Sequence, residues 1–68
     1  MTKTEIRKSL ATAAGSEFPT ISEISRYMGV SRQSVRNLLD GLDFFQQGKR
    51  KRYFVGDVAD RIMQNRGM

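Results

Sequence analysis

Two helix starts stand close together in the middle of the chain, and this spacing restricts the fold more than any other feature. Thr20-Ile-Ser-Glu23 has the form of a capping box, in which the threonine and glutamate side chains each accept a hydrogen bond from the other residue's backbone N–H. Gly29 is expected to end that helix, because a left-handed residue after the last turn costs glycine little. Ser31 then suits the N-cap of a further helix. The sequence therefore predicts a short helix, a tight turn and a second helix.

This second helix, expected over residues 32–42, has an apolar side and a polar side. At about 100° per residue, the apolar side collects Val35, Leu38, Leu39 and Leu42. The opposite side carries Arg32, Gln33, Arg36 and Asn37. Arginine, glutamine and asparagine have donors and acceptors that match base edges in the major groove of DNA. The polar side is therefore a candidate for reading DNA.

The first part of the chain predicts one more helix. Thr2-Lys-Thr-Glu5 is a second capping box, and Ile6 and Leu10 follow at helical spacing. Gly15 is expected to end this helix. The residues up to Pro19 then form a loop. The sequence therefore predicts a helix over residues 2–14.

The last third of the chain predicts a hairpin and a final helix. Residues 43–47 and 53–55 indicate two strands, and the turn between them holds the basic run Lys49-Arg50-Lys51-Arg52. A last helix is expected to begin with Asp57 as its N-cap, with Val58 and Ile62 facing inward. The hairpin thus has a basic tip.

Aromatic side chains are expected mostly in the core. Phe18, Tyr27 and Phe44 lie on apolar stripes, whereas a base-stacking platform needs exposed rings. Phe44 and Phe45 are neighbours in a predicted strand, so only one of them can face the core fully. An exposed Phe45 or Phe54 would be a candidate contact with a second copy or a neighbouring molecule.

The order helix, helix-turn-helix, basic hairpin, helix resembles a winged helix-turn-helix. TISEISRYMGVSRQSVRNLLDGL, at residues 20–42, is similar to the helix-turn-helix of bacterial regulators, with matches at Ile24, Gly29, Val30, Val35 and Leu38. Ser25 stands where that family most often has alanine. GKRKRYFVGDVADRIM, at residues 48–63, is similar to the wing and following helix of excisionase-like and MerR-like small DNA-binding domains. The resemblance implies a single domain over residues 1–68, mainly α with a small β-hairpin.

The placement of charge independently points to a polyanionic partner. The chain has 12 Lys and Arg residues against 7 Asp and Glu residues, which gives a net charge of +5. Six of these cations and two of the carboxylates lie in residues 31–54. The excess positive charge is therefore concentrated on the polar helix and the hairpin, as in a nucleic-acid footprint.

We therefore expect a sequence-specific protein that binds double-stranded DNA. The helix over residues 31–42 would lie in the major groove, and the wing over residues 48–53 would lie on the backbone or in a minor groove. The expected DNA-contacting residues are Ser31, Arg32, Gln33, Ser34, Arg36, Asn37, Lys49, Arg50, Lys51 and Arg52. Two roles stay open: a small transcriptional regulator, or an accessory DNA-binding factor of a phage, plasmid or other mobile element. Partnership with itself, as a dimer or a head-to-tail array on DNA, also stays open.

Other classes of function are disfavoured. The chain has no Cys and no His, so we expect no disulfide, no zinc site, no other metal site and no catalytic residues. No cofactor, small-molecule ligand or membrane segment is expected, and a bacterial cytoplasmic location at the nucleoid fits the composition. The alternative is a winged helix that binds another protein and no nucleic acid.

Overall fold

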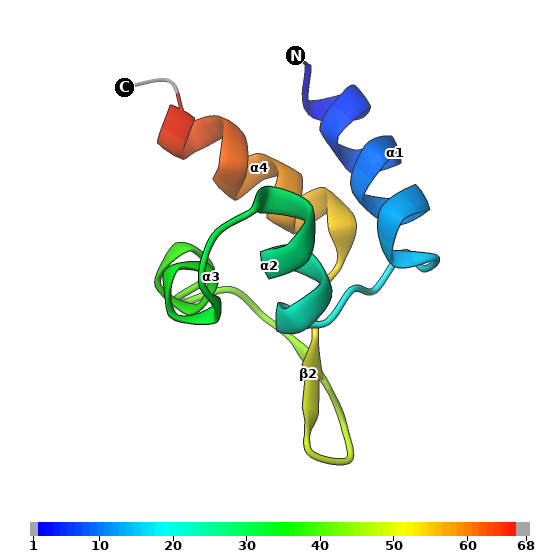
Figure 1. The fold of residues 1–68 in the computed structure, drawn as a ribbon, viewed down its shortest axis with the longest axis vertical. Coiled ribbons are helices and arrows are strands. Elements are labelled where there is room, and N and C mark those ends of the chain that lie inside the picture. The colour runs from blue at the N-terminus through cyan, green and yellow to red at the C-terminus, as the bar shows by residue number, and fades with distance from the viewer. Residues whose placement is uncertain (1, 67–68) are drawn as a thin grey trace.

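The computed structural model describes residues 2–66, which form four helices and a two-stranded antiparallel hairpin (Figure 1). The helices are α1 (Lys3–Ala14), α2 (Ile21–Met28), α3 (Arg32–Leu38) and α4 (Val55–Arg66). The strands are β1 (Phe45–Gln47) and β2 (Arg50–Arg52). This mainly helical arrangement is compatible with a winged-helix fold. In Figure 1 the hairpin projects from the end of the molecule opposite the two termini.

The predicted starts and ends of α1 and α2 are confirmed. The Thr2 hydroxyl accepts from the Glu5 N–H at 3.2 Å, and the Thr2 N–H donates to a Glu5 carboxylate oxygen at 2.8 Å. The Thr20–Glu23 pair repeats this geometry at the start of α2. Both helices end in a left-handed glycine, Gly15 and Gly29. Local hydrogen bonds therefore mark where these two helices begin and end in the sequence.

The core lies where the helices meet above the hairpin. α1 packs against α2 and α4, and α2 packs against α3. The buried cluster draws on all four helices and on the segment after β2: it consists of Leu10, Ile24, Val35, Leu39, Tyr53, Val55 and Val58. The side of α3 that carries Val35 and Leu39 is thus held inward, and its polar side is left to solvent.

The hairpin is shorter than the sequence predicts. The expected returning strand over residues 53–55 is wrong, because β2 is the basic segment Arg50–Arg52. The Tyr53 N–H donates to the Pro19 carbonyl and the Val55 N–H to the Glu17 carbonyl, each at 3.0 Å. The chain after β2 therefore pairs with the loop before α2 instead of with β1. Tyr53 and Val55 become core residues for the same reason.

Two helix ends also differ from expectation. α3 ends at Leu38 and not at Leu42, and Leu39 is its C-cap. α4 begins at Val55, so Asp57 lies in its first turn and is not its N-cap. The Phe54 carbonyl accepts from the N–H groups of Asp57 and Val58, both at 3.1 Å. Burial of Val55 and Val58 against the core thus starts the helix earlier than the Asp57 signal suggested.

The expected burial of two phenylalanines is wrong. Phe18 is 45% exposed and Phe44 is 46% exposed, whereas Tyr27 is half-buried and packs against the core as expected. Phe45 is 64% exposed, so neither of the neighbouring rings in the hairpin is in the core. The hairpin has no helix packed over either face, because it projects away from the helical core (Figure 1).

Candidate nucleic-acid interface

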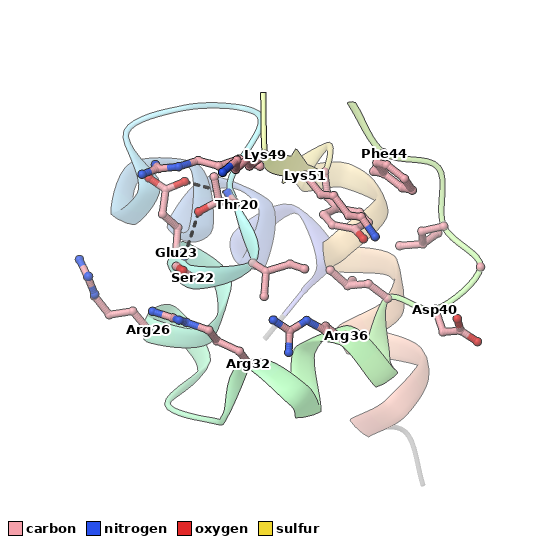
Figure 2. Close-up of a pocket in the computed structure, with 16 residues that line it drawn as sticks. Thr20, Ser22, Glu23, Arg26, Arg32, Arg36, Asp40, Phe44, Lys49 and Lys51 are labelled. Atoms are coloured by element: carbon pink, nitrogen blue, oxygen red, sulfur yellow. Dashed lines mark hydrogen bonds between the residues drawn. The ribbon is translucent and has the colours of Figure 1, made fainter. Parts of the chain in front are cut away.

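One open groove runs between α2, α3 and the hairpin, with a volume of about 790 Å³. Figure 2 shows its side chains, with Arg32 and Arg36 rising from α3 and Lys49 and Lys51 coming from the hairpin. We call it the basic groove, because its lining includes six cations, Arg26, Arg32, Arg36, Lys49, Arg50 and Lys51. Its carboxylates are Glu23 and Asp40. Segments far apart in the sequence therefore bring most of the chain's excess positive charge to one place.

α3 sets two of these cations one turn apart. Its N-cap is Ser31, as predicted, whose hydroxyl accepts from the Ser34 N–H at 3.1 Å. Val35 is fully buried, so the helix cannot rotate without exposing it. Arg32 and Arg36, four residues apart, consequently share the side of α3 that lines the basic groove.

The remaining predicted residues of α3 lie on another flank. Ser34 and Asn37 line a smaller hollow of about 360 Å³ on the side of Met28 and Leu38. Gln33 donates to the Asn37 side-chain oxygen at 3.1 Å. Ser31, Gln33, Ser34 and Asn37 are all exposed. The structure therefore joins Arg32 and Arg36 to the hairpin cations, but it does not bring Ser34 or Asn37 into the same groove.

The hairpin presents three of its four basic residues to the groove. Lys49, Arg50 and Lys51 line it, and the Lys51 ammonium lies 4.8 Å from the centroid of the Phe44 ring. That ring in turn lies 5.8 Å from the Tyr53 ring. The contact between Lys51 and Phe44 is a cation–π arrangement, which holds a flexible lysine at the groove wall.

Arg52 has a different place from its three neighbours. It is half-buried, and its guanidinium donates to the Gln47 side chain at 2.7 Å and to the Phe18 carbonyl at 2.9 Å. It does not line the basic groove. These bonds tie the base of the hairpin to the loop before α2, so Arg52 supports the position of the other basic residues.

Arg26 is a groove residue that sequence reasoning missed. It lies on α2, on which no DNA-contacting residue was expected, and it is exposed. Its signal was available, because Arg26 falls off the apolar stripe of Ile24 and Met28. What the sequence could not supply is the packing of α2 against α3, which turns Arg26 toward the same opening as Arg32 (Figure 2).

The groove keeps its positive charge largely uncompensated. Among the side chains that the structure describes, within residues 2–65, the ion pairs are Lys3–Asp60 and Arg7–Glu17, and neither involves a groove cation. Of the two groove carboxylates, Glu23 accepts from the Thr20 N–H at 2.8 Å in the capping box. Burial, and then the Asp40 charge, raises the pKa of the Tyr53 phenol, so this groove residue adds no negative charge. An anion entering the groove would therefore meet cations without carboxylate partners.

Comparison of the chain with models of protein families, with curated proteins and with solved structures found no match. Among the described residues, no group of three or more acidic side chains is placed to hold a metal ion. None of the helices in residues 2–66 has both the length and the apolar character needed to cross a membrane.

Proposed function

We propose that this chain is a winged helix-turn-helix protein that binds double-stranded DNA in a sequence-dependent manner. α2, the turn at Gly29 and α3 would form the helix-turn-helix, and the hairpin would form the wing. The observation that carries the proposal is the convergence of six cations from α2, α3 and the hairpin on one groove, none of them paired with a carboxylate among the described residues. Phosphate neutralisation is the interaction that such a surface favours most.

The side chains of α3 suit base recognition in the major groove. That groove admits an α-helix, and an arginine can donate two parallel hydrogen bonds to guanine there. Arg36 lines the basic groove and lies beside Arg32 on α3 (Figure 2). We therefore assign base reading to Arg36. Gln33 and Asn37, which are also exposed on α3, would make further contacts.

The hairpin suits a positioning role on the DNA. Lys49, Arg50 and Lys51 are exposed and carry no hydrogen-bond acceptor in their side chains. Lysine acts on phosphate as a point charge, and contacts of this kind fix orientation without reading sequence. The wing would then lie on the backbone or in the minor groove next to the site of α3.

The proposed role is regulation of transcription, or an accessory function in a phage, plasmid or other mobile element, in the bacterial cytoplasm. A module of this size covers a short DNA site. Tight binding then requires several copies side by side or bending of the DNA. Selected sites that are palindromic would favour a regulator, and sites repeated head to tail would favour the accessory factor.

The test is selection of bound sequences from a random duplex library, followed by affinity measurements on Arg36→Ala. If Arg36 reads a guanine, the variant should lose about 1–3 kcal/mol of binding free energy, roughly 5–150-fold in Kd, and should relax preference at one position of the site. Lys8→Ala is the control, because Lys8 is exposed on α1 and lies outside the groove.

Two results would change the interpretation. Equal weakening of every DNA sequence by Arg36→Ala would make this residue a phosphate contact and move base reading to Gln33 and Asn37. Absence of any salt-dependent complex with duplex DNA would contradict the proposal. The alternative, a winged helix that binds another protein, would then remain.

A further inference from the structure

Three phenylalanine rings form an exposed cluster on the hairpin and the segments beside it. Phe18 stands between the other two, with its ring centroid 6.3 Å from that of Phe45 and 5.8 Å from that of Phe54. Phe45 is the most exposed of the three at 64%, and Phe54 is half-buried. We call this set the aromatic patch. Rings gathered in this way are unusual on a free surface, because contiguous apolar patches mark interaction sites more often than single exposed residues do.

Two arginines border the aromatic patch. The Arg7 guanidinium of α1 lies 5.2 Å from the centroid of the Phe54 ring. Arg52 stands directly opposite Phe45 in the register of the hairpin, so both side chains project from the same hairpin face. Arg52 also donates to the Phe18 carbonyl at 2.9 Å. The patch is therefore an apolar centre with positive charge at its edges.

The aromatic patch is separate from the basic groove. Phe44, just before β1, contacts Lys51, whereas Phe45, the first residue of β1, lies beside Phe18, so the two neighbours belong to different surfaces. Phe44 lines the groove under Lys51, whereas Phe18, Phe45 and Phe54 do not line it. A ligand in the groove would accordingly leave the patch uncovered.

Charge favours one kind of occupant. The two positive charges of Arg7 and Arg52 are offset by one nearby carboxylate, that of Glu17. It lies 3.7 Å from the Arg7 guanidinium, in an exposed ion pair. Such a pair contributes little and exchanges easily for another carboxylate. A second copy of this chain placed patch to patch would bring arginines together and would add a second net charge of +5. An acidic partner meets neither penalty.

We propose that the aromatic patch is a docking surface for a short acidic segment of another protein, one that carries an aromatic or branched apolar residue between its carboxylates. The apolar residue would pack on Phe18 and Phe45, and the flanking carboxylates would pair with Arg7 and Arg52. Aromatic residues and arginine are the side chains that contribute most at protein interfaces. This proposal is independent of DNA binding, because it uses a different face of the molecule.

The test begins with selection from random dodecamer peptides displayed on phage, with the full chain as bait. The enriched peptides should combine Asp or Glu with Trp, Phe, Leu or Ile. One of them, labelled with fluorescein, then serves as the probe for anisotropy titrations with Phe45→Ser and its matched control Phe44→Ser. These neighbours are both exposed, so both variants should keep the fold, which circular dichroism checks.

The expected result is a loss of about tenfold or more in peptide affinity for Phe45→Ser, with Phe44→Ser unchanged. Arg7→Gln should weaken binding in the same direction. The proposal is overturned if no peptide is enriched, if the enriched peptides lack carboxylates, or if Phe45→Ser binds like the unchanged chain. It is also overturned if Phe44→Ser alone loses binding, which would place the peptide in the groove, or if sedimentation shows self-association that Phe45→Ser abolishes.

Discussion

Arg61 of α4 holds the end of a helix that lies far from it in the sequence. One of its guanidinium nitrogens donates to the Leu38 carbonyl at 2.9 Å and to the Asp40 carbonyl at 2.8 Å. The last carbonyls of a helix have no partner within the helix. A cation there also interacts favourably with the negative end of the helix dipole. The sequence shows Arg61 only as a basic residue within the last helix. Its role depends on the packing of α4, which no local pattern reveals.

Replacing Arg61 should weaken the end of α3. Arg61→Met should lower the free energy of unfolding by about 1.5–3 kcal/mol, because it removes charged hydrogen bonds to a partly buried carbonyl. Urea denaturation measures the change, with Lys8→Met as a control for loss of an exposed cation. A variant within about 0.5 kcal/mol of the unchanged chain would show that water replaces the guanidinium at no cost.

At the scale of elements, the starts of α1, α2 and α3 and the existence of a hairpin were predictable, but the start of α4 and the second strand of the hairpin were not. Each of these three helix starts is capped by hydrogen bonds to backbone N–H groups three residues away, made by Thr2 with Glu5, by Thr20 with Glu23, and by Ser31. The residues that decide these caps are therefore close together in the sequence. β2 is Arg-Lys-Arg, which carries none of the β-branched or aromatic residues typical of strands. It pairs with β1 because Tyr53 and Val55 are anchored in the core and by the Pro19 and Glu17 carbonyls.

The same division applies to the candidate site. The sequence predicted Arg32, Arg36 and the basic turn, because these residues stand out by type and helical position. It could not separate Arg32 and Arg36 from Ser34 and Asn37, since the two flanks of α3 differ only in what packs beside them. The predicted burial of Phe18 and Phe44 was wrong, because apolar character alone does not show whether another element packs over the hairpin and the segments beside it.

The turn between α2 and α3 depends on the left-handed backbone of Gly29. Gly29 has φ +71°, and a Cβ there would meet no atom within 4 Å, so any cost of substitution comes from the backbone. Gly29→Ala should destabilise the fold by about 1–2 kcal/mol, because alanine is strained in the left-handed region. Gly29→Asn should cost less, because asparagine tolerates that region. Thermal unfolding of both variants tests this, and equal losses would contradict the backbone explanation.

At the scale of the whole molecule, charge is distributed unevenly. The six cations of the basic groove face two carboxylates, whereas Lys3 and Arg7 of α1 pair with Asp60 and Glu17. Exposed pairs of this kind add little stability. They do leave the helical end of the molecule closer to neutral than the groove. A polyanion would therefore be drawn to one face.

This asymmetry predicts a salt dependence specific to the groove. If Arg50 and Lys51 each contact a phosphate, the double variant Arg50→Ala/Lys51→Ala should reduce the slope of log K against log salt by about 1.8. The control Lys3→Ala/Lys8→Ala removes the same charge from α1 and should leave the slope as it is. An unchanged slope in the first variant would exclude the hairpin from the DNA contact.

Phe44 faces the basic groove and Phe45 faces the aromatic patch, and this arrangement limits how the hairpin can change in length. A shift of one residue in its pairing would turn Phe45 toward the groove and Phe44 toward the patch, together with every other side chain of the strand. A shift of two residues would keep both faces. Because the length of the turn sets the register of a hairpin, a single residue added at Gly48 or Lys49 would shift this pairing by one and would disturb two surfaces at once.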